Sequence, residues 1–205
     1  MAELNVLIAF YSRNGSTESL ANAIAGGARK EGAEVRMRRA REVVGSEIMA
    51  RAPGWAENAQ RMNQQYEAPS NSDAEWADAI IFGSPTRFGN VSSELKAYID
   101  GMGALWAQGK LVGKVGSAFT STSTPHGGNE STLLTMYNFM AHLGLVIVPL
   151  GYADPILFIA GTPYGASSVS GQDNTPPTEN DRAVADFQGR RVAQIARALK
   201  EGRKT

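Results

Sequence analysis

Hydroxyl and amide side chains gather in one short loop near the N-terminus, within the run Phe10-Tyr11-Ser12-Arg13-Asn14-Gly15-Ser16-Thr17-Glu18. The loop ends an apolar run that starts at Leu4 and precedes a helical pattern that starts at Ser19. Such a junction directs hydroxyls and free backbone N–H groups into one small volume, which suits an anion. The expected ligands of a phosphate monoester are the side chains of Ser12, Asn14, Ser16 and Thr17 and the backbone N–H groups around Gly15.

This first loop lacks two common nucleotide-binding signatures. The pattern G-x-x-x-x-G-K-[ST] is missing, which argues against hydrolysis of a nucleoside triphosphate. The pattern G-x-G-x-x-G is also missing after the first strand, which argues against a dinucleotide bound there. The alternative interpretation is structural, with Ser16 or Thr17 acting only as the N-cap of the helix.

A second loop, Gly83–Asn90, has the composition of a surface for a flat ligand. Pro85 stiffens the turn, and the glycines at its two ends let the backbone approach a ring closely. Arg87 and Phe88 could stack on an aromatic heterocycle or cap it. The alternative is an ordinary loop in which Arg87 is a surface residue and Phe88 packs into the core.

A third loop, Ser121–Asn129, supplies further hydroxyls that could contact a sugar-like chain or the edge of a ring. Its composition also fits a flexible linker, but its expected place after a buried strand favours a site. His142 lies near the end of the next predicted helix, where a histidine is commonly structural.

Alternating apolar and helical segments indicate the elements that position these loops. Strands are expected at 4–11, 34–39, 77–83, 114–120 and 145–148, and helices at 19–30, 91–101, 130–142 and 181–200. This alternation predicts one α/β domain over residues 1–205, with a parallel sheet covered on both faces. Ligands of such sheets bind at the carboxyl ends of the strands, where all three loops are expected. The segment of about 42–75 is expected to be irregular and exposed, with one weak helical pattern around Glu57–Gln65, and about 151–180 is expected to be an insertion before the last helix.

Composition excludes several classes of protein. The sequence has 20 basic and 20 acidic residues, so its net charge of zero gives no field that would attract nucleic acid. The one basic cluster, Arg36–Arg41, is interpreted as charge that protects an edge strand. Cysteine is absent, which rules out thiol chemistry and cysteine metal sites, and we expect no metal centre. No apolar run approaches the ~20 residues of a membrane span, so we expect a cytoplasmic protein without membrane insertion.

The three loops together describe a site for one phosphate, one hydroxylated chain and one planar ring, which is the outline of riboflavin monophosphate (FMN). The first loop resembles the phosphate loop of flavodoxins. The run from Ile80 to Asn90, IIFGSPTRFGN, closely resembles that of the WrbA family of NAD(P)H:quinone oxidoreductases. Further matches to that family are Leu105-Trp106, the run GLVIVPLGY that begins at Gly144, and the run GTPYGA that begins at Gly161.

The resemblance implies a flavodoxin-like, doubly wound five-stranded parallel sheet of order 2-1-3-4-5. It also implies an enzyme that holds FMN tightly but non-covalently and reduces quinones by two-electron, ping-pong hydride transfer from NAD(P)H. The family commonly forms homotetramers whose active sites draw on neighbouring subunits. Small-molecule quinone and NAD(P)H would therefore be its substrates.

The resemblance also assigns residues, although it names no catalytic residue. Trp106 would line the quinone site, and Asn14 stands where the family often has a tyrosine that contacts the nicotinamide nucleotide. FMN would contact Ser12, Arg13, Asn14, Gly15, Ser16, Thr17, Thr86, Arg87, Phe88, Ser121, Thr122, Ser123, Thr124, Pro125, His126, Gly127 and His142.

Two other functions use the same topology. A one-electron carrier of the flavodoxin type would be expected to carry an acidic surface, whereas this chain is neutral overall and has an insertion suited to a substrate pocket or a subunit contact. A receiver-type regulatory domain needs carboxylates at the end of the first strand, where this chain has Ser12.

Overall fold

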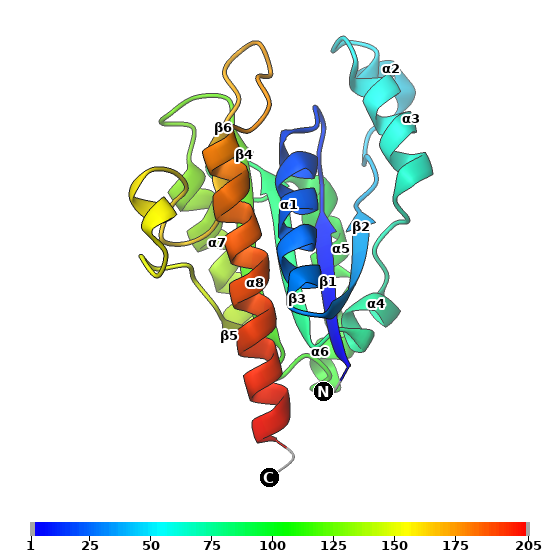
Figure 1. The fold of residues 1–205 in the computed structure, drawn as a ribbon. Coiled ribbons are helices and arrows are strands. Elements are labelled where there is room, and N and C mark those ends of the chain that lie inside the picture. Colours follow the sequence, from blue (N-terminus) through cyan, green and yellow to red (C-terminus); the bar gives the residue numbers. More distant parts are fainter. Residues whose placement is uncertain (1–2, 204–205) are drawn as a thin grey trace.

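A parallel sheet forms the centre of the protein in the computed structural model, which describes residues 3–203. Its strands lie in the order β2-β1-β3-β4-β5, with β6 also paired to β4 (Figure 1). The order 2-1-3-4-5 is therefore confirmed. The strands are β1 Leu4–Phe10, β2 Ala33–Arg39, β3 Ala79–Pro85, β4 Val115–Thr122, β5 Val146–Ile147 and β6 Ser167–Val169.

The fifth position in the sheet is divided between two short strands. β5 pairs with Val115 and Gly116 at the start of β4, whereas β6 pairs with the Thr120–Thr122 end. The chain leaves the sheet between them and includes one 3-10 turn, η1 Pro155–Phe158. The sequence predicted a single strand over 145–148 followed by an insertion. In the structure the insertion interrupts the fifth strand, because Ser167–Val169 returns to the free half of the β4 edge.

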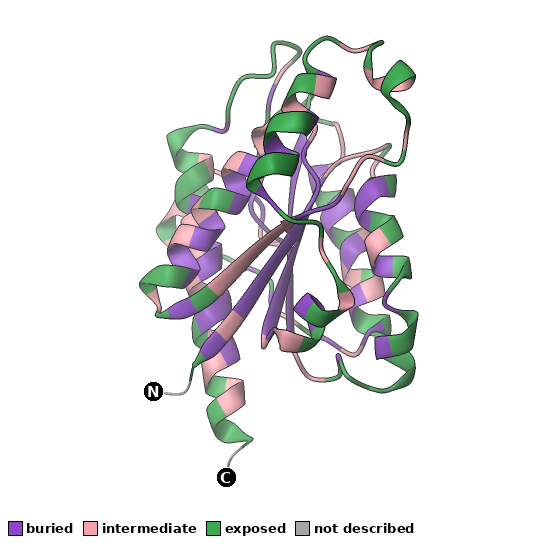
Figure 2. Cartoon of the chain, turned by 90° about the vertical axis from the view of Figure 1, so that its right-hand side faces the viewer, coloured by how far each residue is buried: buried purple, intermediate pink, exposed green. Residues whose placement is uncertain are grey.

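Helices cover both faces of the sheet. Figure 2 shows buried strands between helices whose outer faces are exposed. One face is covered by α1 Ser16–Lys30 and α8 Glu179–Gly202, and the other by α5 Ser93–Asp100, α6 Gly103–Ala107 and α7 Asn129–His142. Within residues 3–203, no helix combines the length and apolar character that crossing a membrane requires.

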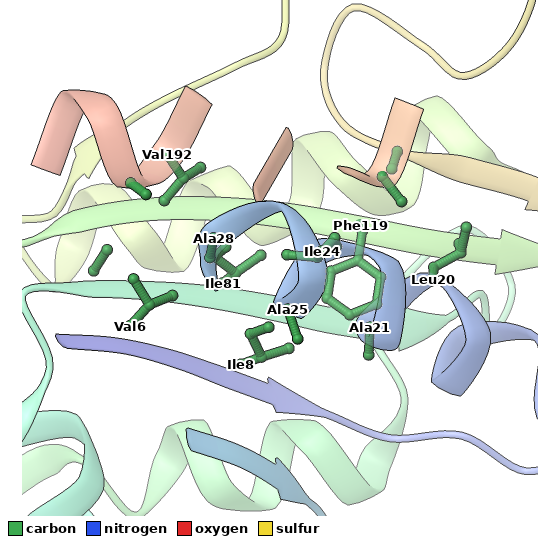
Figure 3. Packing of buried hydrophobic residues seen from close by; sticks show 14 of the residues in the cluster. Val6, Ile8, Leu20, Ala21, Ile24, Ala25, Ala28, Ile81, Phe119 and Val192 are labelled. Carbon is green, nitrogen blue, oxygen red and sulfur yellow. The ribbon is translucent and has the colours of Figure 1, made fainter. Parts of the chain in front are cut away.

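The core under α1 explains why β1 is so strongly apolar. Val6 and Ile8 of β1 are fully buried, and they face Ile24 and its helical neighbours across the interface drawn in Figure 3. Phe119 of β4 packs in the same cluster. A strand that is buried on both faces has a nearly continuous apolar sequence. This is why the sequence predicted a strand at Leu4–Phe10.

Helices α1 and α8 approach each other closely through two glycines. A β-carbon added at Gly27 would lie 2.0 Å from the Asp186 carbonyl oxygen, and one at Gly189 would lie 2.0 Å from the Ile24 carbonyl oxygen. Neither glycine has positive φ, so it is the space between the helices that demands glycine. This contact fixes α1, and with it the loop that precedes α1.

The segment of about 42–75 is largely helical, so the expectation of an irregular segment was wrong outside the weak helical pattern around 57–65. It forms α2 Ser46–Met49, α3 Trp55–Gln65 and α4 Asn71–Trp76. Trp55, Met62 and Ala74 are buried. A capping box starts α4, in which Ser70 and Asp73 each accept a hydrogen bond from the other's backbone N–H. Many polar residues concealed these short helices, although the Ser70-x-x-Asp73 spacing was a readable signal.

Candidate functional site

The carboxyl ends of β1, β3 and β4 bring the three polar loops together. The strand register sets Phe10 beside Gly83 and Pro85 beside Ser121, so the loops that follow start at the same edge of the sheet. They surround a cavity of about 190 Å³. Its lining residues are Ser12, Arg13, Asn14, Ser16, Thr17, Pro85, Thr86, Arg87, Ser121, Thr122, Ser123, Ser170 and Asn174.

The first loop is shaped as an anion cradle. Gly15 has φ of 99° and is the N-cap of α1, and its N–H donates to Ser12 Oγ over 3.1 Å. No side chain caps the helix, so the interpretation of Ser16 or Thr17 as the N-cap is excluded. The first N–H groups of α1 and the hydroxyls of Ser16 and Thr17 remain next to the cavity, where a phosphate would gain from the helix dipole.

A buried hydroxyl pair joins the first loop to the third. Thr17 Oγ1 and Ser121 Oγ lie 2.8 Å apart, and both residues line the cavity. Each hydroxyl can donate one hydrogen and accept others, so the pair can bond internally and still donate to a ligand oxygen. Ser121, Thr122 and Ser123 therefore reach the cavity, as the sequence predicted.

Hydrogen bonds of the Thr86 side chain fix the conformation of the second loop. Its hydroxyl donates to the Gly127 carbonyl over 3.1 Å and accepts from the Gly89 N–H over 3.1 Å. Phe88 has φ of 54° and is fully exposed, so the alternative in which Phe88 packs into the core is wrong. An exposed aromatic ring beside Thr86 and Arg87 leaves a surface on the rim where a planar ligand can stack.

The rest of the third loop supports the cavity from outside. Thr122 Oγ1 and the Gly127 N–H both donate to the Thr124 carbonyl, over 2.9 Å and 3.0 Å. Pro125 lines a separate hollow between the starts of α7 and α8. Of the predicted ligands, Gly15, Phe88, Thr124, Pro125, His126 and Gly127 do not line the cavity itself.

Among residues 3–203, two cationic side chains and no carboxylate line the cavity. Arg13 and Arg87 both reach it, and the Arg13 guanidinium carbon lies 3.7 Å from the ring centroid of Trp55. Glu18, in the first turn of α1, is paired with Arg61 instead. This donor set fits FMN: the positive end of α1 and the arginines suit its phosphate, the hydroxyls suit its polyol chain, and the rim suits its ring.

Tyr11 lies just below the cavity but does not supply a base. Burial, reinforced by the Glu94 and Glu42 carboxylates, raises the pKa of Tyr11. The phenol therefore stays protonated at neutral pH. The Arg39 cation and a hydrogen bond with the Trp55 side chain lower the pKa of Tyr11, but by less than burial raises it.

Two residues assigned by resemblance lie at the other end of the sheet. Trp106 belongs to α6, which Figure 1 places beside the N-terminus, away from the loops. His142 ends α7, a 14-residue helix that starts at the third loop and spans about 20 Å at 1.5 Å per residue. Both side chains are exposed. Within one chain, the structure does not bring Trp106 or His142 to the cavity.

The structure adds three lining residues that sequence reasoning missed, namely Pro85, Ser170 and Asn174. Asn14 Nδ2 donates to Asn174 Oδ1 over 2.7 Å, a contact between residues 160 positions apart. Pro85 belonged to a loop already singled out. Ser170 and Asn174 follow β6, whose three-residue length gave no readable strand pattern.

This chain is similar in sequence to flavin-dependent reductases and quinone dehydrogenases. The family model for NADPH-dependent FMN reductase matches residues 4–155. A Rhizobium meliloti protein named NAD(P)H dehydrogenase (quinone) 3 is 45% identical, over 97% of this chain and 94% of its own length. NAD(P)H dehydrogenase (quinone) of Geotalea uraniireducens is 44% identical, over 96% of this chain and 99% of its own length.

Solved structures share the fold. A WrbA-like flavodoxin from Agrobacterium tumefaciens superimposes with a TM-score of 0.67 and 25% identity, covering 96% of this chain and 99% of its own. An archaeal flavodoxin matches with a TM-score of 0.61 and 17% identity, over 95% of this chain and 99% of its own, which shows the shared fold alone.

Proposed function

This chain belongs to the NADPH-dependent FMN reductase family and has NAD(P)H dehydrogenases (quinone) as full-length relatives, and from this we propose that it is an FMN-dependent NAD(P)H:quinone oxidoreductase. FMN, when bound, supplies the redox chemistry, and the protein supplies position and electrostatics. NAD(P)H is the electron donor and a quinone is the acceptor. The resemblance to the WrbA family that the sequence motifs indicated is confirmed by these relatives and by the structural match to a WrbA-like flavodoxin.

The observation that carries the proposal is the cavity at the ends of β1, β3 and β4. Its hydroxyls, the α1 N-terminus and Arg13 would hold the phosphate and the polyol chain. Thr86 and Arg87 would hold the ring at the rim, with Phe88 beside it. A cavity of about 190 Å³ is smaller than the roughly 300–1,000 Å³ usual for a ligand pocket, so the ring of FMN would lie partly outside it, where a substrate can reach it.

Purification followed by a visible spectrum tests cofactor binding directly. The protein should be yellow, or become so with added FMN, and heat denaturation should release FMN that is identified by mass. A colourless protein that does not bind added FMN overturns the proposal.

We propose further that the two substrates react in turn by two-electron, ping-pong transfer. One accessible ring face can serve NAD(P)H first and the quinone afterwards. Initial rates measured against NADH at several fixed benzoquinone concentrations should give parallel double-reciprocal lines. Intersecting lines would show that both substrates are bound together.

A one-electron carrier remains the alternative function, because flavodoxins share this fold. The two differ in their need for a partner protein. The enzyme should oxidise NADH with a soluble benzoquinone when nothing else is added, whereas a carrier should show little turnover until a reductase is supplied.

Assembly completes the proposal. Trp106 and His142 are exposed at the far end of the sheet, so they could reach a cavity only from another copy of the chain. We therefore propose a homotetramer in the cytoplasm, where NAD(P)H is available, with Trp106 lining a neighbour's quinone site. Light scattering should give about four times the mass of one chain, 21.9 kDa. A monomer with full quinone turnover overturns this part.

A further inference from the structure

The segment of residues 170–177, between β6 and α8, crosses from the edge of the sheet to the first loop. Its first residue, Ser170, and its Asn174 both line the cavity that the proposed function assigns to FMN. Figure 1 shows this segment as the orange loop above the sheet, between the end of β6 and the start of α8. It is the one wall of the cavity that does not follow β1, β3 or β4.

Both ends of the segment are firmly held. The Ser170 N–H and hydroxyl both donate to the Thr122 carbonyl, over 2.8 Å and 3.2 Å. The Thr175 N–H returns to the Ser170 carbonyl over 2.7 Å, which closes the loop on itself. Two prolines and the capping box between Thr178 and Asp181 then start α8. The tip, residues 171–174, is therefore carried on a stiff base.

Only one hydrogen bond joins this tip to the first loop among residues 3–203, and it is the Asn14–Asn174 bond of 2.7 Å. Asn174 has φ of 54°, a left-handed conformation that asparagine tolerates better than most residues. That conformation aims its side-chain oxygen at Asn14. The bond thus links two walls of the cavity that are distant in sequence.

We propose that residues 170–177 form a latch over the FMN site and that the Asn14–Asn174 hydrogen bond keeps the latch closed. The inference rests on the proposed function and deepens it, because it assigns Asn174 and the role of Asn14. FMN must leave past the latch, so the bond slows cofactor dissociation. Asn14 then acts in cofactor retention, and not as the nicotinamide contact that the resemblance implies.

The Asn174→Gly variant isolates the bond. Glycine adopts a φ of 54° freely, so the loop keeps its path while the accepting oxygen is lost. One solvent-exposed hydrogen bond contributes modestly, and we expect FMN to dissociate about 3-fold faster. The rate is measured by stopped-flow fluorescence as FMN leaves the oxidised holoprotein into an excess of apoflavodoxin. Gln172→Ala, in the same exposed tip, is the matched control and should leave the rate unchanged.

A double-mutant cycle with Asn14→Ala separates the latch from a nicotinamide contact. If the latch depends on this bond, the effects of Asn14→Ala and Asn174→Gly on FMN release are not additive, and the double variant should release FMN no faster than Asn14→Ala alone. If Asn14→Ala raises the KM for NADH while FMN dissociation in Asn174→Gly is unchanged, the latch is wrong.

The experiment gives a different result if the proposed function itself is wrong. In that case wild-type protein does not bind FMN at all, and no dissociation can be recorded for any variant. If wild type binds FMN and all four proteins release it at the same rate, the cofactor assignment stands and the latch alone is overturned.

Discussion

Individual hydroxyls carry the binding chemistry of this protein, and the Thr17–Ser121 pair is the clearest case. The two oxygens are 2.8 Å apart and buried, and they join loops 104 positions apart. A buried hydroxyl that loses its partner costs about 1–3 kcal/mol. The pair therefore ties two loops together and lines the cavity in which we propose that FMN binds.

Removing one of these hydroxyls should weaken FMN binding. Thr17→Val keeps the shape of the side chain but strands the Ser121 hydroxyl and removes a phosphate donor. We expect the FMN dissociation constant to rise about 10-fold, measured by quenching of FMN fluorescence. Thr17→Ser restores the hydroxyl and should bind nearly as wild type does. Wild-type affinity in Thr17→Val, or a loss in Thr17→Ser as large as that in Thr17→Val, would contradict a role for the hydroxyl.

At the residue scale, the sequence placed residues at the cavity where a loop directly follows a long apolar strand, and their roles as ligands stay predictions. Ser12, Thr17, Thr86 and Ser121 were all named as ligands and all line the cavity. Ser170 and Asn174 could not be named, because their position depends on a pairing between β6 and β4 that spans 47 residues and leaves no local pattern. Trp106 and His142 came from resemblance alone, and their roles stay predictions.

Packing between elements decides how rigidly the first loop is presented. The contact between α1 and α8 is so close that neither Gly27 nor Gly189 has room for a β-carbon. The sequence revealed the amphipathic helices but not this contact, because a glycine within a helix gives no sign of what lies opposite.

Gly27→Ala should destabilise the protein and Gly26→Ala should not. The added methyl group at Gly27 would collide with the Asp186 carbonyl of α8, and such overpacking costs about 1–3 kcal/mol. Gly26 precedes it in the same helix with nothing within 4 Å, so alanine there should be neutral or add about 0.5–1 kcal/mol. Urea denaturation measures both. Equal midpoints for the two variants would contradict the close contact.

The link between α4 and β2 should depend on pH through Asp73. Burial raises the pKa of Asp73, but hydrogen bonds from Ser70 and Arg38 outweigh it, and the net pKa is lowered from 3.8. A carboxyl whose pKa is lower in the folded state stabilises the fold above about pH 3.8, and that stabilisation is lost as the pH falls through the folded-state value.

Asp73→Asn should therefore lower the free energy of unfolding by about 2 kcal/mol at pH 7, from the lost helix cap and ion pairs. The difference from wild type should shrink as the pH falls below 3.8. Asp100→Asn removes an exposed partner of Lys96 and should have little effect at any pH. A deficit for Asp73→Asn that persists unchanged at pH 2.5 would exclude this account.

Over the whole molecule, stability and cofactor binding are linked. The cavity needs the first, second and third loops and the latch in place, so FMN should bind only the folded chain. At FMN 100 times its dissociation constant, the fold should gain about 2.7 kcal/mol, which raises Tm by about 5–10 °C for a chain of this size. Differential scanning fluorimetry of apoprotein with and without FMN measures this. Riboflavin, which lacks the phosphate, should give a smaller shift.

The architecture as a whole was predictable because parallel sheets leave strong signals. The order 2-1-3-4-5 was expected and found, since four strands are long or fully buried. The helix at 55–65 left only a weak pattern around 57–65, and the helices at 46–49 and 71–76 were missed because they are short and polar, with few buried residues each. The division of the fifth strand into β5 and β6 was missed because it depends on their pairing with β4, and the short sequence of β6 shows no strand pattern.

That split strand also sets an order of events during synthesis and folding. The half of the β4 edge that flanks the cavity is covered by β6, and the latch follows β6 directly. Long-range pairings form late, because closing the intervening loop costs entropy first. A ribosome-bound chain that has emerged only to β5 lacks β6, the latch and α8, so one face of the sheet is incompletely covered and the cavity is open on one side. Loading of FMN is then the last step of maturation, after the C-terminal fifth of the chain has emerged.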